Sequence, residues 1–454
     1  MVGQEDQFSV LTRVSAGTSM GNLFRRFWLP ALLASELSEP DGVPVRLRIL
    51  GEDLIAFRDT EGRIGIVGAY CPHKMAPLFF GRNEACGLRC VYHGWKFNVD
   101  GDCVEIPNIT PPDNFEALKQ RMRLKSYPAR EAGGLIWVYM GPKKQIPELP
   151  EMAWLDLPKE HIHVSRWLHR SNWLQAVEGE IDTSHISFLH SVLDPDPDAP
   201  DRVRLARDGA PEIIMRETDY GFYYGARRRF GDEYYWRITQ WMLPMWSAIA
   251  PPIDDLLGNG RAWVPIDDYH TMAFGYRYRP DEPLSGEEVT YLDSGAFFPP
   301  RGEWRPVRLP HGYTIDAYVP TASQADDYFI DREVQRTETF TGIWGVNEQD
   351  RSLQECMPSL PGQPTGIVDR SNEHLVKSDL PTVTARRMLT RLAHQLEEGQ
   401  EPSAALQSEQ YAVRAFGVVS PISDFDELMK QHGQLAKPIK YKKNESKAKQ
   451  ETAR

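Results

Sequence analysis

The chain is 454 residues long, more than one ordinary core accommodates, so two or three domains are expected. Its 41% hydrophobic and 26% charged residues are typical of a globular protein that folds in water, and its net charge of −12 excludes nucleic acid as the main partner. No apolar run reaches the roughly 18–20 residues that span a bilayer, and the first residues lack a signal-peptide pattern. We therefore expect a cytoplasmic protein without a membrane partner.

The predicted elements fall into four segments along the chain. Residues 1–43 form a helical segment, with apolar residues at helix-like intervals until Pro30 ends the pattern. Residues 44–145 show short alternating runs separated by turn signals, such as Val45–Ile49 and Leu54–Arg58, and predict a small antiparallel β domain. The third segment, 146–435, begins within a proline-rich connector at 142–158. Residues 436–454 form a basic tail that we expect to be disordered.

The third segment mixes helical and strand-like patterns. A helical stretch is predicted at 171–190, strand-like alternation at 195–320, and further helical patterns near 323–356 and 379–400. This order places a long run of strands between helices, as in a second, larger domain.

Cysteine and histidine alternate on two short stretches of the predicted β domain. The first reads Cys71-Pro-His73 and the second Cys90-Val-Tyr-His93. Disulfide-stapled proteins use more cysteines and spread them more evenly. Because each stretch supplies one thiolate and one imidazole, the pattern suits a two-iron cluster in which one iron binds both thiolates and the other both imidazoles. A zinc site is the alternative that this residue set leaves open.

A second set of metal-binding residue types lies in the predicted helix at 171–190. Asp182, His185 and His190 follow the spacing Asp-x₂-His-x₄-His. An iron bound by two histidines and one carboxylate keeps open positions for O₂ and a substrate. The two histidines are five residues apart, about 140° around an ideal helix, so a bulge or a helix end must bring their rings together. The third ligand must be a carboxylate further along the chain, and the candidates are Asp326, Asp327, Asp331, Asp350 and Asp369.

Residues 71–97 resemble the cluster motif of the Rieske non-heme iron ring-hydroxylating oxygenases, and the run from Met20 to Gly141 is similar to their phthalate dioxygenase branch. The resemblance implies an α+β fold with an N-terminal Rieske β domain. The catalytic domain would be a C-terminal helix-grip (START/Bet v1-like) domain with an antiparallel sheet and helices. It also implies one Rieske [2Fe–2S] cluster and one mononuclear non-heme Fe(II) per chain.

The same resemblance implies roles for single residues. It makes His185 and His190 iron ligands, and the run Gly345–Arg351 most resembles the ligand-bearing helix, which favours Asp350 as the third ligand. Asp182 would then join the Rieske histidine of one subunit to the iron histidine of the next within a homotrimer. Such a carboxylate fixes the tautomer of the histidine and offers a short path for electrons.

No glycine-rich dinucleotide motif follows a predicted strand, so the chain is not expected to take hydride from NADH or NADPH itself. We therefore expect a terminal oxygenase supplied by a separate flavin- and ferredoxin-type NAD(P)H reductase. The predicted activity is hydroxylation or dihydroxylation of an aromatic carboxylate with O₂. O-demethylation of a methoxylated aromatic acid, with release of formaldehyde, shares the same motifs. A non-catalytic Rieske electron carrier is the alternative of another class, and it would need no second iron.

An aromatic acid needs a cationic partner, for which arginine is suited. The residues considered for substrate contact are Asn172, Arg204, Arg207, Arg228 and Arg237.

Overall fold

The computed structural model describes residues 7–119, 121–195, 205, 208–253, 255–359, 362, 364–439 and 441. Within these residues the strands form five antiparallel sheets, and helices cover the largest one, so the predicted α+β class is confirmed. The described helices include none that is both long and apolar enough to cross a membrane.

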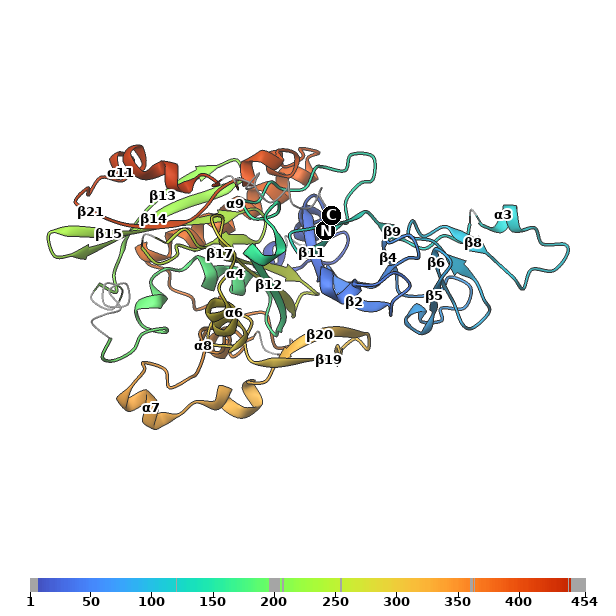
Figure 1. Ribbon diagram of the computed structural model, residues 1–454, viewed down its shortest axis with the longest axis horizontal. Helices are drawn as coiled ribbons and strands as arrows, with labels where there is room; N and C mark the ends of the chain where they lie inside the picture. Colours follow the sequence, from blue (N-terminus) through green and yellow to red (C-terminus); the bar gives the residue numbers. More distant parts are fainter. Residues whose placement is uncertain are drawn as a thin grey trace, which may run out of the picture.

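Two small sheets make up the part of the chain that carries the four clustered cysteines, at the right of Figure 1. The predicted runs at 45–49 and 54–58 are strands, as expected. The first sheet has the order β2-β3-β4-β9, with β2 Val45–Ile49, β3 Glu52–Arg58, β4 Ile64–Gly68 and β9 Ser126–Tyr127. The second has the order β5-β6-β7-β8, with β5 Arg82–Glu84, β6 Gly87–Arg89, β7 Lys96–Phe97 and β8 Cys103–Glu105. Helix α3 (Phe115–Lys119) lies at the outer end of this part (Figure 1).

The N-terminal segment is only partly helical. Helices α1 (Gln7–Thr12) and α2 (Ser19–Phe24) are followed by strand β1 (Trp28–Leu33), which contains Pro30. The predicted helix is therefore wrong over these last residues. Strand β1 is the edge of a three-stranded sheet, β1-β11-β10, where the missing N–H of proline is tolerated, and its register shifts just after Pro30. The partners are β10 (Ala129–Ala132) and β11 (Leu135–Tyr139).

The largest sheet has eight strands and carries the cavity described below. Its order is β12-β18-β17-β16-β15-β14-β13, and β21 pairs with the first half of β15. The strands are β12 Ile162–His169, β13 Glu212–Thr218, β14 Gly221–Phe230, β15 Glu233–Met242, β16 Trp246–Ala248, β17 Gly258–Pro265, β18 Thr271–Tyr278 and β21 Phe416–Ser420.

Helices cover both faces of this sheet. Helix α4 (Trp173–Ile181) contacts β17 and also α8 (Val346–Gln354) and α9 (Leu380–Glu397). On the opposite face α11 (Phe425–His432) places Phe425 against Trp236, with ring centroids 5.6 Å apart. Side chains alternate between the faces of a strand, so odd-numbered residues of β15 face α4 and even-numbered ones face α11.

The remaining described elements connect these layers. A hairpin of β19 (Gly302–Arg308) and β20 (Thr314–Pro320) joins the two parts of the molecule, because its Tyr313 hydroxyl donates to the Leu54 carbonyl at 2.7 Å. The other helices are α6 Gly286–Asp293, α7 Arg332–Thr337 and α10 Ser403–Leu406. The 3₁₀ turns are η1 Ala34–Leu37, η2 Leu78–Phe80, η3 Lys159–His161, η4 His185–Ser187, η5 Gln324–Phe329, η6 Lys377–Asp379, η7 Ser408–Tyr411 and η8 Gly433–Ala436.

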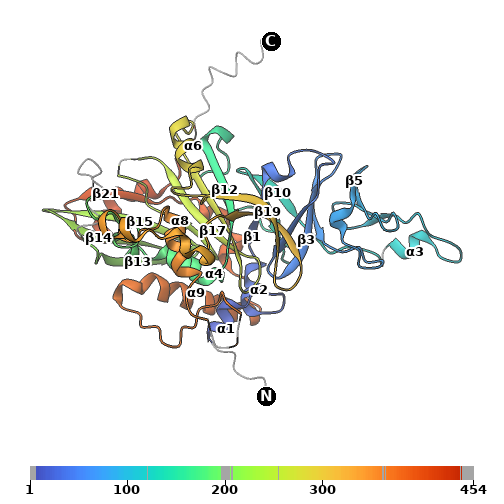
Figure 2. The same ribbon diagram turned by 90° about the horizontal axis from the view of Figure 1, so that it is seen from below.

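Both views place β5 and α3 at one end of the molecule, while α4 and α8 lie in the body of the other part (Figures 1 and 2). The two sets of predicted metal-binding residues are thus held in different parts of one chain.

Candidate metal centres and cavity

Two loops of the small sheets carry the predicted cluster ligands. Each loop is closed by a backbone hydrogen bond of the same kind. The N–H of Cys71 donates to the carbonyl of Ala76 at 2.9 Å, and the N–H of Cys90 donates to that of Trp95 at 2.8 Å. Because each cysteine sits at the start of such a closed loop, the backbone fixes both thiols on adjoining loops of a rigid β scaffold.

Both thiols are buried, with Cys71 1% and Cys90 2% exposed. Burial raises the pKa of Cys71 to about 12, an effect that the neighbouring Cys90 thiol reinforces and the N–H of His73 opposes. The protein alone therefore keeps Cys71 as a thiol. A positive metal is what converts such a buried pair into thiolate ligands.

The two histidines of the loops lie against each other and against a tryptophan. The rings of His73 and His93 have centroids 4.4 Å apart, and His73 stacks on Trp95 at 4.5 Å with an interplanar angle of 1°. Trp95 is held in turn by its Nε1, which donates to Asn108 Oδ1 at 2.8 Å. The Nδ1 of His73 is buried and has no hydrogen-bond partner among the described residues, as expected of a nitrogen that faces a metal. The donor set of two thiols and two imidazoles fits a [2Fe–2S] cluster.

The second centre depends on where α4 ends. The helix stops at Ile181, Asp182 is extended (φ −84°, ψ 109°), and His185 begins the 3₁₀ turn η4. The predicted helix at 171–190 is therefore shorter than expected, and its end brings together two histidines that an undistorted helix would point apart.

Asp350 completes this centre from α8. The Nε2 atoms of His185 and His190 are 3.1 Å apart, and Asp350 Oδ1 lies 3.2 Å from His190 Nε2 and 3.7 Å from His185 Nε2. Metal–ligand bonds of about 2.1 Å at right angles would place donor atoms about 3.0 Å apart. The three atoms therefore form a nearly ready-made face of an octahedral site, and these residues fit a mononuclear iron.

The two histidines of this centre determine the ionisation of Asp350. Burial opposes ionisation of Asp350, but His190 and His185 outweigh it and lower the pKa of the carboxyl to about 2. The carboxylate is therefore ionised throughout the physiological range, as a metal ligand must be.

Each histidine also has a partner on its far side. His190 Nδ1 lies 2.7 Å from Gln349 Oε1, and His185 Nδ1 lies 3.6 Å from Asp182 Oδ2. Such partners orient ligand rings and set their tautomers. Gln349 was not singled out from the sequence, although it immediately precedes the aspartate.

The competing aspartates serve other purposes. Asp326 and Asp331 accept backbone N–H groups at the starts of η5 and α7, and Asp369 accepts the N–H of Ser371. Asp327 is not part of the cluster of metal-binding groups around His185 either. Among the described residues, Asp350 is the candidate aspartate that reaches the two histidines.

A cavity of about 430 Å³ opens between α4, α8 and the large sheet, and the three candidate iron ligands are part of its lining. Its sheet wall consists of residues that share one face, because β14 pairs Tyr224 with Thr239 of β15, and β17 pairs Asn259 with Arg277 of β18. Three arginines line this cavity: Arg237, Arg261 and Arg277.

Arg261 is already neutralised. Its Nη1 donates to Glu180 Oε2 at 2.5 Å, and the same nitrogen lies 4.0 Å from Asp350 Oδ2. Glu180 is fixed by a second bond, from the Ser247 hydroxyl at 2.9 Å. This ion pair ties α4 to β17 beside the candidate iron site. Sequence reasoning had not identified Arg261 or Arg277, because their place in the wall follows from strand register.

Of the residues considered for substrate contact, Arg237 lines the cavity. Contrary to expectation, Asn172 and Arg228 do not. The side chain of Asn172 caps α4 and donates to two backbone carbonyls, while Arg228 is completely buried and donates to the carbonyls of Thr183 and Asp208. Arg204 and Arg207 lie outside the described residues, as does the end of the predicted tail.

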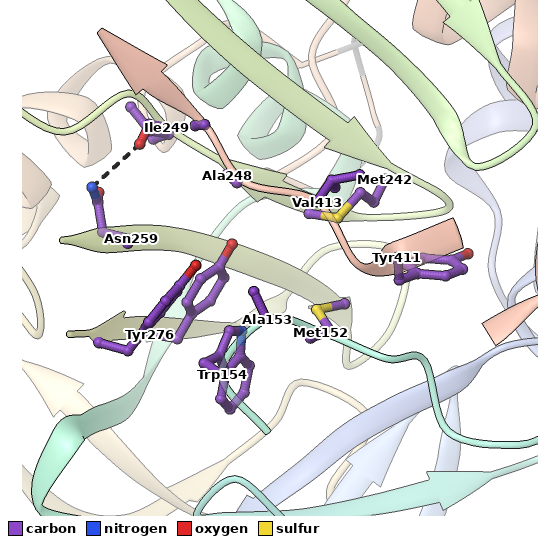
Figure 3. Close-up of a pocket in the computed structure, with 13 residues that line it drawn as sticks. Met152, Ala153, Trp154, Met242, Ala248, Ile249, Asn259, Tyr276, Tyr411 and Val413 are labelled. Atoms are coloured by element: carbon purple, nitrogen blue, oxygen red, sulfur yellow. Dashed lines mark hydrogen bonds between the residues drawn. The ribbon is translucent and has the colours of Figure 1, made fainter. Parts of the chain in front are cut away.

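A small crevice, shown in Figure 3, lies on the opposite face of the sheet, between residues such as Trp154, Tyr276 and Tyr411. Its volume of about 10 Å³ is room for no more than one water molecule. Of the crevice and the cavity, therefore, only the cavity on the α4 face can hold a substrate of aromatic size.

Two family models match the chain. Residues 27–128 match the model described as "Rieske [2Fe-2S] domain", and residues 138–448 match the model described as "LigXa C-terminal domain like".

Several characterised proteins are similar over much of their length. The 3-chlorobenzoate-3,4-dioxygenase oxygenase subunit of Comamonas testosteroni is 39% identical over 411 residues, covering 88% of this chain and 91% of the relative. The phthalate 4,5-dioxygenase oxygenase subunit of Pseudomonas putida is 38% identical over 399 residues, 84% of each chain. The 5,5'-dehydrodivanillate O-demethylase oxygenase subunit of a Sphingobium strain is 34% identical over 66% of this chain and 69% of its own.

Among solved structures, Pseudomonas putida CBB5 NdmA with caffeine superposes with a TM-score of 0.56 at 16% sequence identity, covering 90% of this chain and all (100%) of that one. At this identity the likeness establishes a shared fold.

Proposed function

Because the chain belongs to the Rieske oxygenase alpha subunits, we propose that it uses O₂ to hydroxylate or dihydroxylate an aromatic carboxylate. It is the oxygenase component of a multicomponent system that acts on aromatic compounds, and electrons reach it from reductase or ferredoxin partners. The proposed donor is a flavin- and ferredoxin-type NAD(P)H reductase. The aromatic carboxylate as substrate is our inference from the cavity.

Arg237 is the observation that carries this inference. The residue is 8% exposed, and its guanidinium donates to the carbonyl of Ala250 at 3.2 Å and the hydroxyl of Tyr235 at 3.3 Å. Within the described part of the chain no carboxylate pairs with it, and its Nε has no hydrogen-bond partner. Burying a cation without an anion is unfavourable, so the site favours a substrate that brings its own negative charge.

The rest of the cavity suits the ring of such a substrate. Apolar side chains from several elements line it: Ile186, Ile249, Pro251, Leu257 and Phe297. Cavities of a few hundred cubic ångströms with an apolar lining and a few polar groups are typical of sites for small organic ligands. The similar chlorobenzoate and phthalate enzymes support the same choice, because both are named for aromatic acids.

The metal groups would be held by the residues described above: a [2Fe–2S] cluster by Cys71, His73, Cys90 and His93, and an iron by His185, His190 and Asp350. When bound, the cluster supplies single electrons and the iron activates O₂. The chain's own residues prepare the site. Asp350 provides a permanent negative charge, and the apolar wall limits the entry of water.

Asp182 has a proposed role between two copies of the chain. Strand β5, which follows the first cluster loop, and helices α4 and α8, which carry cavity residues, lie in different parts of the molecule (Figures 1 and 2). Around the cluster histidines the surface is apolar and exposed: Met75 is 65%, Val91 57% and Tyr92 61% exposed. We propose that this surface docks against Asp182 of a second copy in a homotrimer, so that electrons cross between copies rather than within one chain.

O-demethylation of a methoxylated aromatic acid is the second candidate. It is supported by the similarity to the dehydrodivanillate O-demethylase subunit, whose name describes a methoxylated aromatic acid as substrate. An oxygenase of either kind would use the same metal residues and the same arginine, so the product has to separate them.

Product analysis tests both candidates. The purified holoenzyme with a compatible reductase and NADH is offered 3-chlorobenzoate, phthalate, a methoxylated benzoate, and the corresponding neutral amides. We expect oxygen uptake and product with acids and little with amides, and formaldehyde release identifies demethylation. Equal turnover of the amides would overturn an acid as the substrate class.

Two arginine variants, one in the cavity and one as a control, refine this experiment. Replacement Arg237→Gln should lower kcat/KM for acids by roughly 10- to 100-fold, as expected for a charge-assisted bond. Arg216→Gln removes a guanidinium from the outer edge of the same sheet, where it pairs with Asp426, and should change little.

A further inference from the structure

We propose that the cavity has a second anion-binding position, at Arg277, and that the preferred substrates therefore carry an acidic group at each end. This inference rests on the proposed function, since it concerns the same cavity and the same class of aromatic acid.

Arg277 is a cation without an anion. It lies on β18 and lines the cavity, and its guanidinium makes no hydrogen bond or ion pair in the part of the chain that the structure describes. Its guanidinium lies over the ring of Phe297, whose centroid is 5.7 Å from the guanidinium carbon. Burial lowers the pKa of Arg277, as expected where a positive charge is only partly compensated.

The two carboxylates whose charges act on Arg277, those of Glu288 and Asp255, are hydrogen-bonded to another arginine. Glu288 accepts from Arg279 Nε at 2.7 Å, and Asp255 accepts from Arg279 Nη1 at 3.0 Å. Arg279 therefore uses the two acidic groups that could have neutralised its neighbour. The structure leaves the charge of Arg277 facing the cavity, as it does the charge of Arg237.

The two arginines flank the cavity. Arg237 is on β15 and Arg277 on β18, and strands β16 and β17 separate them. Three steps of about 4.8 Å put their strands about 14 Å apart across the sheet. Between them in the same cavity wall lie Ile249 and Asn259, which pair through an isolated bridge, and Asn259 pairs in turn with Arg277. A flat molecule with an acid at each end would match this layout.

The candidate iron site faces the middle of that span. Arg261 belongs to the intervening strand β17, and its Nη1 lies 4.0 Å from Asp350 Oδ2. Since Glu180 neutralises Arg261, this middle position is not a third anion site. A diacid held at both ends would thus present an internal part of its ring system, rather than an acid group, to the metal.

Binding measurements test the proposal without turnover. Benzoate, phthalate, terephthalate and a biphenyl dicarboxylate with its acids at the two far para positions are titrated calorimetrically into anaerobic holoenzyme. We expect at least one of the two end-to-end diacids to bind about 10-fold or more tightly than benzoate and phthalate, as one additional charge-assisted contact would give. Equal affinities for all four acids would overturn the proposal.

Variants assign the effect to the residue. Arg277→Gln should abolish the advantage of the diacid and leave the affinity for benzoate within about twofold, while Arg277→Lys should restore part of the advantage. Arg216→Gln serves as the control for removing one positive charge from the sheet. A diacid advantage that survives in Arg277→Gln contradicts the proposal, and so does loss of benzoate binding in that variant, which would make Arg277 the primary anchor.

The failure of the proposed function has a different signature. If no acid of the panel binds the wild-type holoenzyme while a neutral aromatic does, the substrate is not an aromatic acid. If benzoate binds and requires Arg237 but the diacids gain nothing, only the second position is wrong. Melting temperatures of all variants identify any that fail to fold.

Discussion

Gln349 fixes the tautomer of His190. Its Oε1 lies 2.7 Å from His190 Nδ1, and its Nε2 donates to the carbonyl of Ile343 at 2.9 Å. Because the amide nitrogen is committed to that carbonyl, the oxygen faces the ring and Nδ1 must carry the proton. The lone pair of Nε2 then points at Asp350 and His185.

Replacement Gln349→Leu should therefore weaken metal binding at the His185 centre. We expect a loss of roughly 10- to 100-fold in affinity, since partners of this kind orient the ligand ring. The affinity is measured as the iron that the protein retains after dialysis against increasing concentrations of a chelator. The visible spectrum of the cluster serves as the internal reference. Gln354→Met alters another buried glutamine of α8 away from the histidines. An equal loss in that variant would mean that the helix, not the hydrogen bond, was affected.

Asp350→Ala should remove the mononuclear iron while the cluster spectrum persists. Asp350 supplies the one carboxylate of the three-atom face, whereas the cluster loops belong to another part of the chain. Metal analysis should fall from about three irons per chain to about two, the number in the cluster alone. Asp369→Ala is the matched control. Full iron content in Asp350→Ala would identify a different ligand.

The features that local patterns determine could be predicted from the sequence. The cluster residues are grouped within two short loops, and strands such as Val45–Ile49 follow from alternation alone. The spacing of His185 and His190 indicated that the helix had to end or bulge near them, and α4 does end, at Ile181.

Features that depend on tertiary register could not be predicted in the same way. Arg261 and Arg277 reach the cavity because β17 and β18 pair in one particular register. Asn172 has a polar side chain near the site in sequence, but the start of α4 needs it as a cap. The apolar pattern of Trp28–Leu33 is compatible with a helix or a strand. The segment forms a strand because it pairs with β11.

His169 should make stability depend on pH. The residue is fully buried, and neither ring nitrogen has a hydrogen-bond partner among the described residues. Burial lowers the pKa of His169 to about 4, although Glu355 at 4.0 Å opposes the shift. The unfolded chain, with a pKa near 6.5, therefore binds more protons between pH 6.5 and 4, and stability falls as the pH drops through that window.

Comparison with His169→Phe isolates this contribution. At pH 7.5 both proteins contain an uncharged ring, whereas at pH 4.5 only the wild type is penalised, by about 3 kcal/mol. Urea unfolding is followed by tryptophan fluorescence at the two pH values. Between pH 7.5 and pH 4.5, the free energy of unfolding should fall further for the wild type than for His169→Phe. The Trp263 ring, 5.2 Å from His169, reports on the site. Parallel pH profiles would refute a neutral buried histidine.

Asp182→Ala should leave both metal groups loaded and nearly abolish turnover. The carboxylate lies 3.6 Å from His185 Nδ1 and accepts the N–H of Ser184 at 2.7 Å, yet its side chain is still 32% exposed. Burial opposes its ionisation, but His185 lowers the pKa of Asp182, so the carboxyl stays ionised. A loss of about 100-fold or more in steady-state rate is expected if the carboxylate both orients His185 and offers the proposed path between copies.

Single-turnover measurements separate the proposed bridge from a structural effect. In the chemically reduced protein, cluster oxidation on mixing with O₂ and substrate should be slow in Asp182→Ala, although the iron content and the cluster spectrum match the wild type. Asp182→Asn keeps an acceptor toward His185 and should recover part of the rate. A dissociated monomer, in turn, should retain its cluster and be nearly inactive. Wild-type rates of cluster oxidation in Asp182→Ala would exclude this residue from the electron path.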